Sequence, residues 1–155
     1  MEELQPLNCS GSSEEEIGQL LSNLAHTPFT FDDVFFASVE AFYIAIRSPL
    51  EMLPEVAFLF GREAKNKGSK LKKKLRPTHG AWMGEAFELG SDTHHQLVKR
   101  AIRAKLVQNP DILSAFLATA GRPIIHDTGW PESRFTQLPA VKFCSMLAEL
   151  REELA

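Results

Sequence analysis

Hydrophobic residues recur at helical spacing through most of the chain. The clearest case is residues 91–108, where Ser91 or Asp92 can cap a helix with one apolar stripe. A shorter segment follows Ser38, a good N-cap, and Ser48-Pro49 would end it. This pattern predicts helices over residues 14–21, 38–47, 50–65, 91–108, 109–121 and 143–154.

Strand patterns are fewer and shorter. Two β-prone stretches flank an Asp-Asp turn within residues 29–36, which predicts a small hairpin. Ile124-Ile125 predicts a short strand before a polar loop, and residues 81–90 show no clear preference. The lysine-rich residues 65–76 are interpreted as a connection. The predicted fold class is therefore mainly α, a compact helical domain with a small β-hairpin.

Length and composition favour a single globular domain. The 155 residues, 44% hydrophobic and 24% charged, can bury a core, and we predict one domain over residues 17–155 after a flexible leader, residues 1–16. A net charge of -3 gives no reason to expect nucleic acid or membrane binding. Two cysteines, a polar N-terminus and no apolar run of about 18 residues predict a cytoplasmic protein.

Three charges fall where apolar residues are expected. Residues 38–47 are apolar nearly all round, except for Glu40 and Arg47, which lie within about 20° on a helical wheel. Because buried unpaired charge is costly, these two either meet neighbours at the surface or face a solvent-filled cleft. Lys105, central in the apolar stripe of residues 91–108, either extends its amine to solvent or presents it to a pocket. Together they favour one polar cavity.

A series of short motifs runs in a fixed order through residues 20–154. The motifs are Ser22-Asn23, Ser38-x-Glu40, Gly61-Arg62, Ala101-x-x-x-Lys105-x-x-Gln108-Asn109, Asp127-x-x-Trp130 and a closing helix with Leu147 to Arg151. Because these motifs occur in this order, the chain resembles the NADAR (YbiA-like) family of N-glycosidases. The resemblance implies a YbiA-like fold and a hydrolase. Suggested substrates are phosphorylated ribosylamino-pyrimidines of riboflavin biosynthesis and ADP-ribose attached to guanine in nucleic acid.

The resemblance also implies a set of site residues. Glu40 and Asp127 would be catalytic, and Asn23, Arg62, Trp82, Lys105 and Trp130 would bind the substrate. We add Arg47, whose cation suits a phosphate group, to the substrate-binding residues. Breaking a ribosyl C–N bond builds positive charge on the sugar, which a carboxylate stabilises, while a carboxylate also activates water. We expect Glu40 in either of these roles and Asp127 to orient water or ribose hydroxyls, or the reverse. Tryptophan would stack on a base, and the cations would hold phosphate.

The chain departs from the family pattern at several positions. Ala41 and Arg47 stand where the family commonly has His and Lys, and a guanidinium cannot add to an opened sugar as an amine can. Pro131, Val141 and Cys144 replace Gly, Asn and Gly. These changes leave an alternative open, a catalytically inactive module that binds NAD-like or ADP-ribose-like ligands.

The remaining polar clusters limit the partners. Residues 65–76 hold seven basic side chains, and are either a solvated segment or a contact for the phosphates of ADP-ribosylated nucleic acid. His94-His95 diverge on a helix, no metal-ligand spacing occurs, and no phosphate-loop motif is present. We therefore expect no metal, cofactor or membrane partner, and the resemblance implies a small nucleotide-like substrate.

Overall fold

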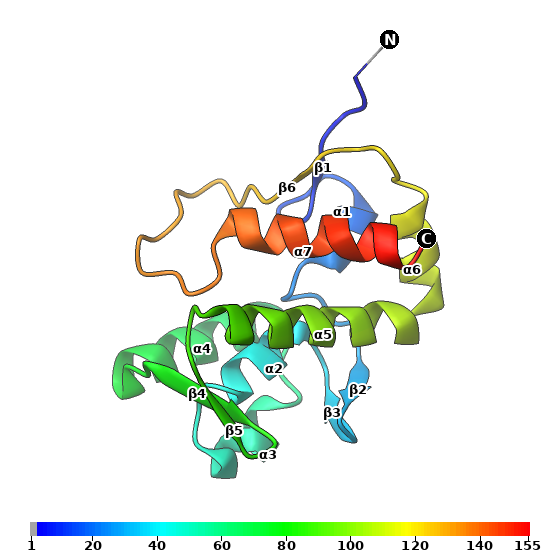
Figure 1. Ribbon diagram of the computed structural model, residues 1–155. Helices are drawn as coiled ribbons and strands as arrows, with labels where there is room; N and C mark the ends of the chain where they lie inside the picture. Colours follow the sequence, from blue (N-terminus) through cyan, green and yellow to red (C-terminus); the bar gives the residue numbers. More distant parts are fainter. Residues whose placement is uncertain (1–2) are drawn as a thin grey trace.

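The computed structural model describes residues 3–155 and confirms a mainly helical fold with short strand pairs (Figure 1). Its helices are α1 (Glu16–Leu21), α2 (Val39–Ala45), α3 (Leu53–Val56), α4 (Gly61–Leu75), α5 (Asp92–Gln108), α6 (Pro110–Leu117), α7 (Ala140–Glu153) and the 3-10 turn η1 (Leu50–Met52). The strands are β1 (Leu7–Asn8), β2 (Phe29–Phe31), β3 (Val34–Phe36), β4 (His79–Trp82), β5 (Glu85–Glu88) and β6 (Ile124–Ile125).

Helix α5 is the centre of the fold. Ser91 caps its first turn, because the Ser91 hydroxyl accepts the His94 N–H at 3.3 Å. The predicted apolar stripe is buried between α7 on one side and α2 with the β2–β3 hairpin on the other (Figure 1). A helix with neighbours on opposite sides buries a broad face, so α5 connects the two halves of the core.

The predicted hairpin at residues 29–36 is confirmed. Its turn residues, Asp32 and Asp33, have φ values of 49° and 65°, a left-handed conformation that aspartate tolerates better than most residues. The Asp32 carboxylate accepts the indole N–H of Trp82 at 2.7 Å, and the Trp82 ring packs against Phe42 and Phe31. This contact holds the β4–β5 hairpin against the core. The sequence had shown no clear preference for residues 81–90, which include β5.

The prediction of one helix over residues 50–65 is wrong. The chain forms η1 and α3, extends at Phe60, and starts a new helix at Gly61, whose φ of +60° suits glycine. The interpretation of residues 65–76 as a connection is also wrong, because they belong to α4. The residues of α4 that are buried are Ala64, Gly68 and Leu71. These three positions are too few to give a clear apolar stripe, although the lysines around them are good helix formers.

The N-terminal segment differs from the flexible leader expected over residues 1–16. Strand β1 pairs in parallel with β6, and Leu7 and Cys9 are fully buried. Residues 7–13 are therefore packed against the domain, although two paired residues are too few to give a strand pattern in sequence. Among the described residues, no helix has the length and apolar character needed to cross a membrane.

Candidate functional site

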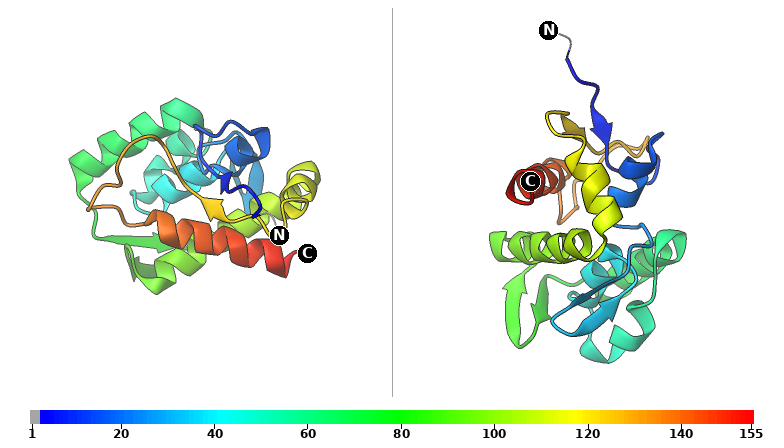
Figure 2. Two further views of the ribbon diagram at one scale, coloured as in Figure 1. Left: turned by 90° about the horizontal axis from the view of Figure 1, so that it is seen from above. Right: turned by 90° about the vertical axis from the view of Figure 1, so that its right-hand side faces the viewer.

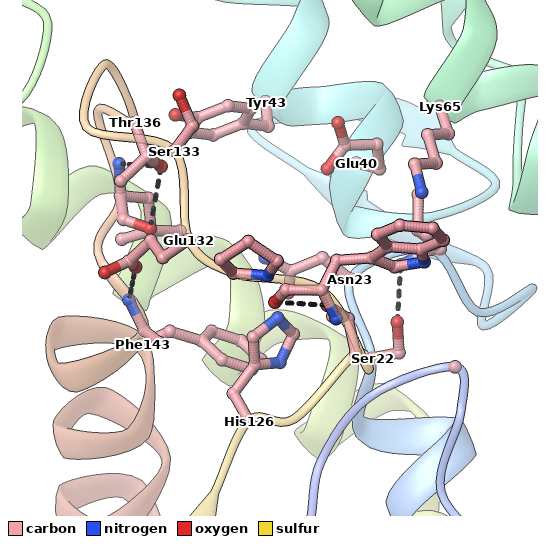
Figure 3. A pocket seen from close by; sticks show the side chains of 17 residues that line it. Ser22, Asn23, Glu40, Tyr43, Lys65, His126, Glu132, Ser133, Thr136 and Phe143 are labelled. Carbon is pink, nitrogen blue, oxygen red and sulfur yellow. Dashed lines mark hydrogen bonds between the residues drawn. The ribbon is translucent and has the colours of Figure 1, made fainter.

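A cavity of about 520 Å³ opens between α2, the start of α4 and the loop of residues 126–139 (Figure 3). This volume lies in the range of small-molecule binding sites. Its polar lining includes Asn23, Glu40, Tyr43, Lys65, His126 and Glu132, and Trp130 and Phe143 contribute aromatic rings. Helices thus form one wall and an irregular loop forms the other.

Glu40 is held on the helical wall by the first turn of α2. Ser38 caps this turn by accepting the Ala41 N–H at 3.0 Å, and its hydroxyl donates to the Leu59 carbonyl at 2.7 Å. The backbone N–H of Glu40 donates to the Asn23 carbonyl at 2.8 Å, which joins the preceding turn to the helix. The sequence pattern that singled out Glu40 therefore coincides with a cavity wall.

The Glu40 carboxylate faces the cavity without a hydrogen bond from any described residue of the chain (Figure 3). Burial raises the pKa of Glu40, while the positive charges of Arg47 and Lys65 act in the opposite direction. A carboxyl group in this setting can accept a proton or a ligand hydrogen bond, because nothing in the described chain competes for its oxygens.

Arg47 lies behind the cavity wall rather than in it. Its guanidinium donates to the Gly68 carbonyl at 3.3 Å and lies 4.9 Å from the centre of the Tyr43 ring. Burial raises the pKa of Tyr43 to about 12, so the phenol at the cavity surface keeps its proton at neutral pH. Arg47 therefore acts on Glu40 through its charge, from inside the protein.

Lys105 is fully buried and contacts a turn that lines the cavity. Its amine donates to the Ser22 carbonyl at 3.1 Å, and burial lowers its pKa to about 7. The amine neither reaches solvent nor lines the cavity, so neither outcome considered for this residue is observed. It fixes the Ser22-Asn23 turn, whose side chains do line the cavity.

Asp127 is not brought together with Glu40. Its carboxylate accepts the Gly129 N–H at 2.9 Å, and its backbone carbonyl accepts the hydroxyl of Ser10 at 2.8 Å, outside the cavity. His126 and Thr128, its two neighbours, face the cavity instead. Adjacent residues of an extended segment point to opposite sides, which explains why the expected pair of acids does not form here.

The other expected substrate-binding residues divide into two groups. Asn23 and Trp130 line the cavity, and the Trp130 side chain is 81% exposed at its mouth. Arg62 is exposed on α4 and Trp82 lies in the core, and neither lines the cavity. Val141 is 71% exposed and also lies outside the lining, so the departure at this position removes no cavity group.

Comparison with known protein families matches residues 16–152 to the family described as bacteriophage protein GP30.3. The chain belongs to the bacteriophage GP30.3 family. No curated protein matches this GP30.3 family member. Among solved structures it is similar to the NMR structure of the E. coli protein YbiA, with a TM-score of 0.65 and 18% identity, over 98% of this chain and 88% of that one. At this identity the likeness confirms the YbiA-like fold alone.

Several cavity residues of this GP30.3 family member were not found from sequence. Tyr43 lies about one helical turn after Glu40, so its place on the same face of α2 could have been predicted from the sequence. Lys65 was hidden by the wrong assignment of α4. Glu132 carries no sequence signal. Its carboxylate accepts the Ala140 N–H at 2.6 Å, at the first residue of α7, and this contact between loop and helix appears only in three dimensions (Figure 3).

Proposed function

We propose that this protein is an N-glycosidase that hydrolyses the bond between a ribose and a nitrogen base in the cavity beside α2. The observation that carries the proposal is the Glu40 carboxylate, which lines the cavity and accepts no hydrogen bond from the described residues. A YbiA-like fold supports it, since the sequence resembles the family named after that protein. The cavity is also large enough for a nucleotide-like ligand.

Glu40 is assigned the central chemical role. In this reaction water adds to the ribosyl C1′ and gives a proton to Glu40, while the base leaves with the electron pair of the C–N bond. The same carboxylate is suited to stabilise the positive charge that develops on the sugar. Arg47 and Lys65 counteract the effect of burial on the Glu40 pKa, which favours the ionised form needed for both tasks.

Glu132 takes the place that the sequence had given to Asp127. One of its oxygens is occupied by the start of α7, so the other is free to orient water or a ribose hydroxyl. Glu132 and Glu40 line the same cavity from opposite walls (Figure 3). Two carboxyl groups on either side of the reacting bond are the usual arrangement for glycoside hydrolysis.

The remaining lining provides contacts for a nucleotide. The buried Asn23 side-chain oxygen lacks a partner among the described residues and is suited to accept a ligand N–H or O–H. The Trp130 indole is accessible for stacking on a base or adenine ring, and the Lys65 amine is suited to bind phosphate.

Two substrate classes fit this site. One is a small ribosylamino-pyrimidine phosphate, and the other is an ADP-ribose conjugate of guanine in nucleic acid. The position of Lys65 at the cavity, on a helix rich in further cations, favours a conjugate whose anionic part extends along α4. Both cysteines are free thiols, which suits activity in a reducing compartment such as the cytoplasm.

The competing proposal is a module that binds such ligands without cleaving them. It is favoured by Arg47, which stands in place of an amine and lies outside the cavity. Mass spectrometry separates the two. We expect the protein to release free base from ribosylamino-pyrimidine phosphate or from ADP-ribosylated oligonucleotide. Saturable binding of both compounds with no released base would reject the glycosidase and leave the binding module.

A further inference from the structure

The charge of this protein is concentrated on one helix. Residues 61–76 contain eight of the 17 Lys and Arg residues and one of the 20 Asp and Glu residues. This stretch has a formal charge of +7, while the rest of the chain has -10. The net charge of -3 therefore conceals a strongly basic surface, which follows α4 along one edge of the molecule (Figure 2).

The cations of α4 are not neutralised within the described part of the chain. Lys67 is paired with Glu55 at 2.7 Å, and no other cation of α4 is in an ion pair there. Burial, and to a smaller extent the nearby Arg47, lower the pKa of Lys72. Like charges one helical turn apart destabilise a helix. Cations in the last turn suit the helix dipole, but they leave most of the positive charge of α4 without an acidic partner, so an external polyanion is the partner that this surface matches.

Exposed aromatic rings continue the surface at the N-terminal end of α4. Phe60 stacks on His26 with ring centres 4.1 Å apart, and Phe58 lies 5.4 Å from Phe35. All three phenylalanines are exposed, and Phe58 is 64% exposed. We refer to these four residues as the aromatic end. Flat rings beside a cationic surface are the features that bind unpaired bases and their phosphates.

The cavity lies beside the first turns of α4. The Gly61 N–H donates to the Leu24 carbonyl at 2.7 Å, and Leu24 lines the cavity. Lys65, one turn further along α4, lines it as well. A strand that lies on this surface therefore passes the mouth of the cavity, where the exposed Trp130 ring is also located.

We infer that the outer face of α4 and the aromatic end bind single-stranded nucleic acid, with its phosphates on the lysines and its bases on the exposed rings. A double helix is disfavoured because its bases are stacked on one another and cannot reach the rings or enter the cavity. Binding itself needs no catalysis. Only the delivery of a modified base to the cavity rests on the proposed glycosidase function.

The test is a fluorescence anisotropy titration with an unmodified single strand of about 12 nucleotides, a length that one small domain can cover. We expect binding that weakens with salt, with a slope of log K against log salt of about -3 for four phosphate contacts. A duplex of the same length should bind at least about tenfold more weakly.

Matched variants locate the surface. Lys70→Gln with Lys73→Gln removes two exposed charges from α4, and we expect affinity to fall about tenfold and the salt slope to decrease by about 1.4. Arg100→Gln with Arg103→Gln removes the same charge from the exposed face of α5 and should change the affinity less than about twofold. Phe58→Ala with Phe60→Ala should weaken binding about tenfold and leave the slope unchanged.

The outcomes separate this inference from the proposed function. Equal oligonucleotide binding by the wild type and by Glu40→Gln supports the inference even if no base is ever released. Release of base from a free nucleotide conjugate, with no oligonucleotide binding at low salt, overturns the inference and leaves the glycosidase intact. Equal losses for the α4 and α5 variants, or a duplex that binds as tightly as a single strand, would also overturn it.

Discussion

The two walls of the cavity differ in how they hold their side chains. On the helical wall, Glu40 belongs to a capped helix whose other faces are buried in the core. On the loop wall, Glu132 is fixed by one hydrogen bond to the start of α7, and Trp130 is largely exposed. We infer that the helical wall positions the chemistry, while the loop wall adapts to the ligand. The predictions below test this difference.

The largest effect is expected on the helical wall. Glu40→Gln preserves the shape of the side chain but removes the base and the negative charge, so turnover should fall by about 10²–10⁴. The measurement is the rate of base release from a substrate that the wild type cleaves. Glu51→Gln, an exposed change on η1, is the control and should leave the rate unchanged. Full activity in Glu40→Gln would remove this residue from the mechanism.

The loop wall should show a smaller effect, and it distinguishes two acids. Glu132→Gln should lower turnover about 10–100-fold, the value of one hydrogen bond to a charged group. Asp127→Asn should change it less than about threefold, because that carboxylate lies outside the cavity. Both rates are measured on the same substrate. A larger loss in Asp127→Asn than in Glu132→Gln would show that the loop rearranges when substrate binds.

Trp130 tests the adaptable side of the comparison. Trp130→Ala should raise KM about tenfold, since stacking on a base contributes about 1–3 kcal/mol, and should change kcat little. Its exposed position predicts no loss of thermal stability. Steady-state kinetics and thermal unfolding measure the two quantities. A Trp130→Ala protein with lower kcat and unchanged KM would assign this ring to the reaction rather than to binding.

The smallest effect concerns the stability of the helical wall. Because burial raises the pKa of Glu40, the folded protein binds this proton more tightly than the unfolded chain does. The stabilising contribution is present below the ordinary pKa of 4.5 and is lost as pH rises through the folded pKa. Glu40→Gln should therefore melt at a higher temperature than the wild type at pH 8, a gain that shrinks toward acidic pH. Equal melting curves at pH 8 would contradict this.

Sequence patterns predicted the helical wall better than the loop wall. The sequence predicted α2 with its cap Ser38 and the position of Glu40, because an N-cap residue followed by apolar residues at helical spacing indicates a helix. The placement of Asp127 and Glu132 was not recoverable, because an irregular loop has no period that assigns side chains to faces. The prediction for α4 failed for a different reason, since three small or apolar positions among many lysines do not form a clear apolar stripe.

The central claim is that the ribosyl–base bond is cleaved next to Glu40, inside the cavity. A crystal structure of Glu40→Gln with an uncleaved substrate tests it most directly, because this variant should bind without turnover. We predict that the ribose C1′ lies within hydrogen-bonding reach, or one water molecule, of the side chain at position 40, with the base against Trp130. A substrate bound with its ribose outside this cavity would contradict the account.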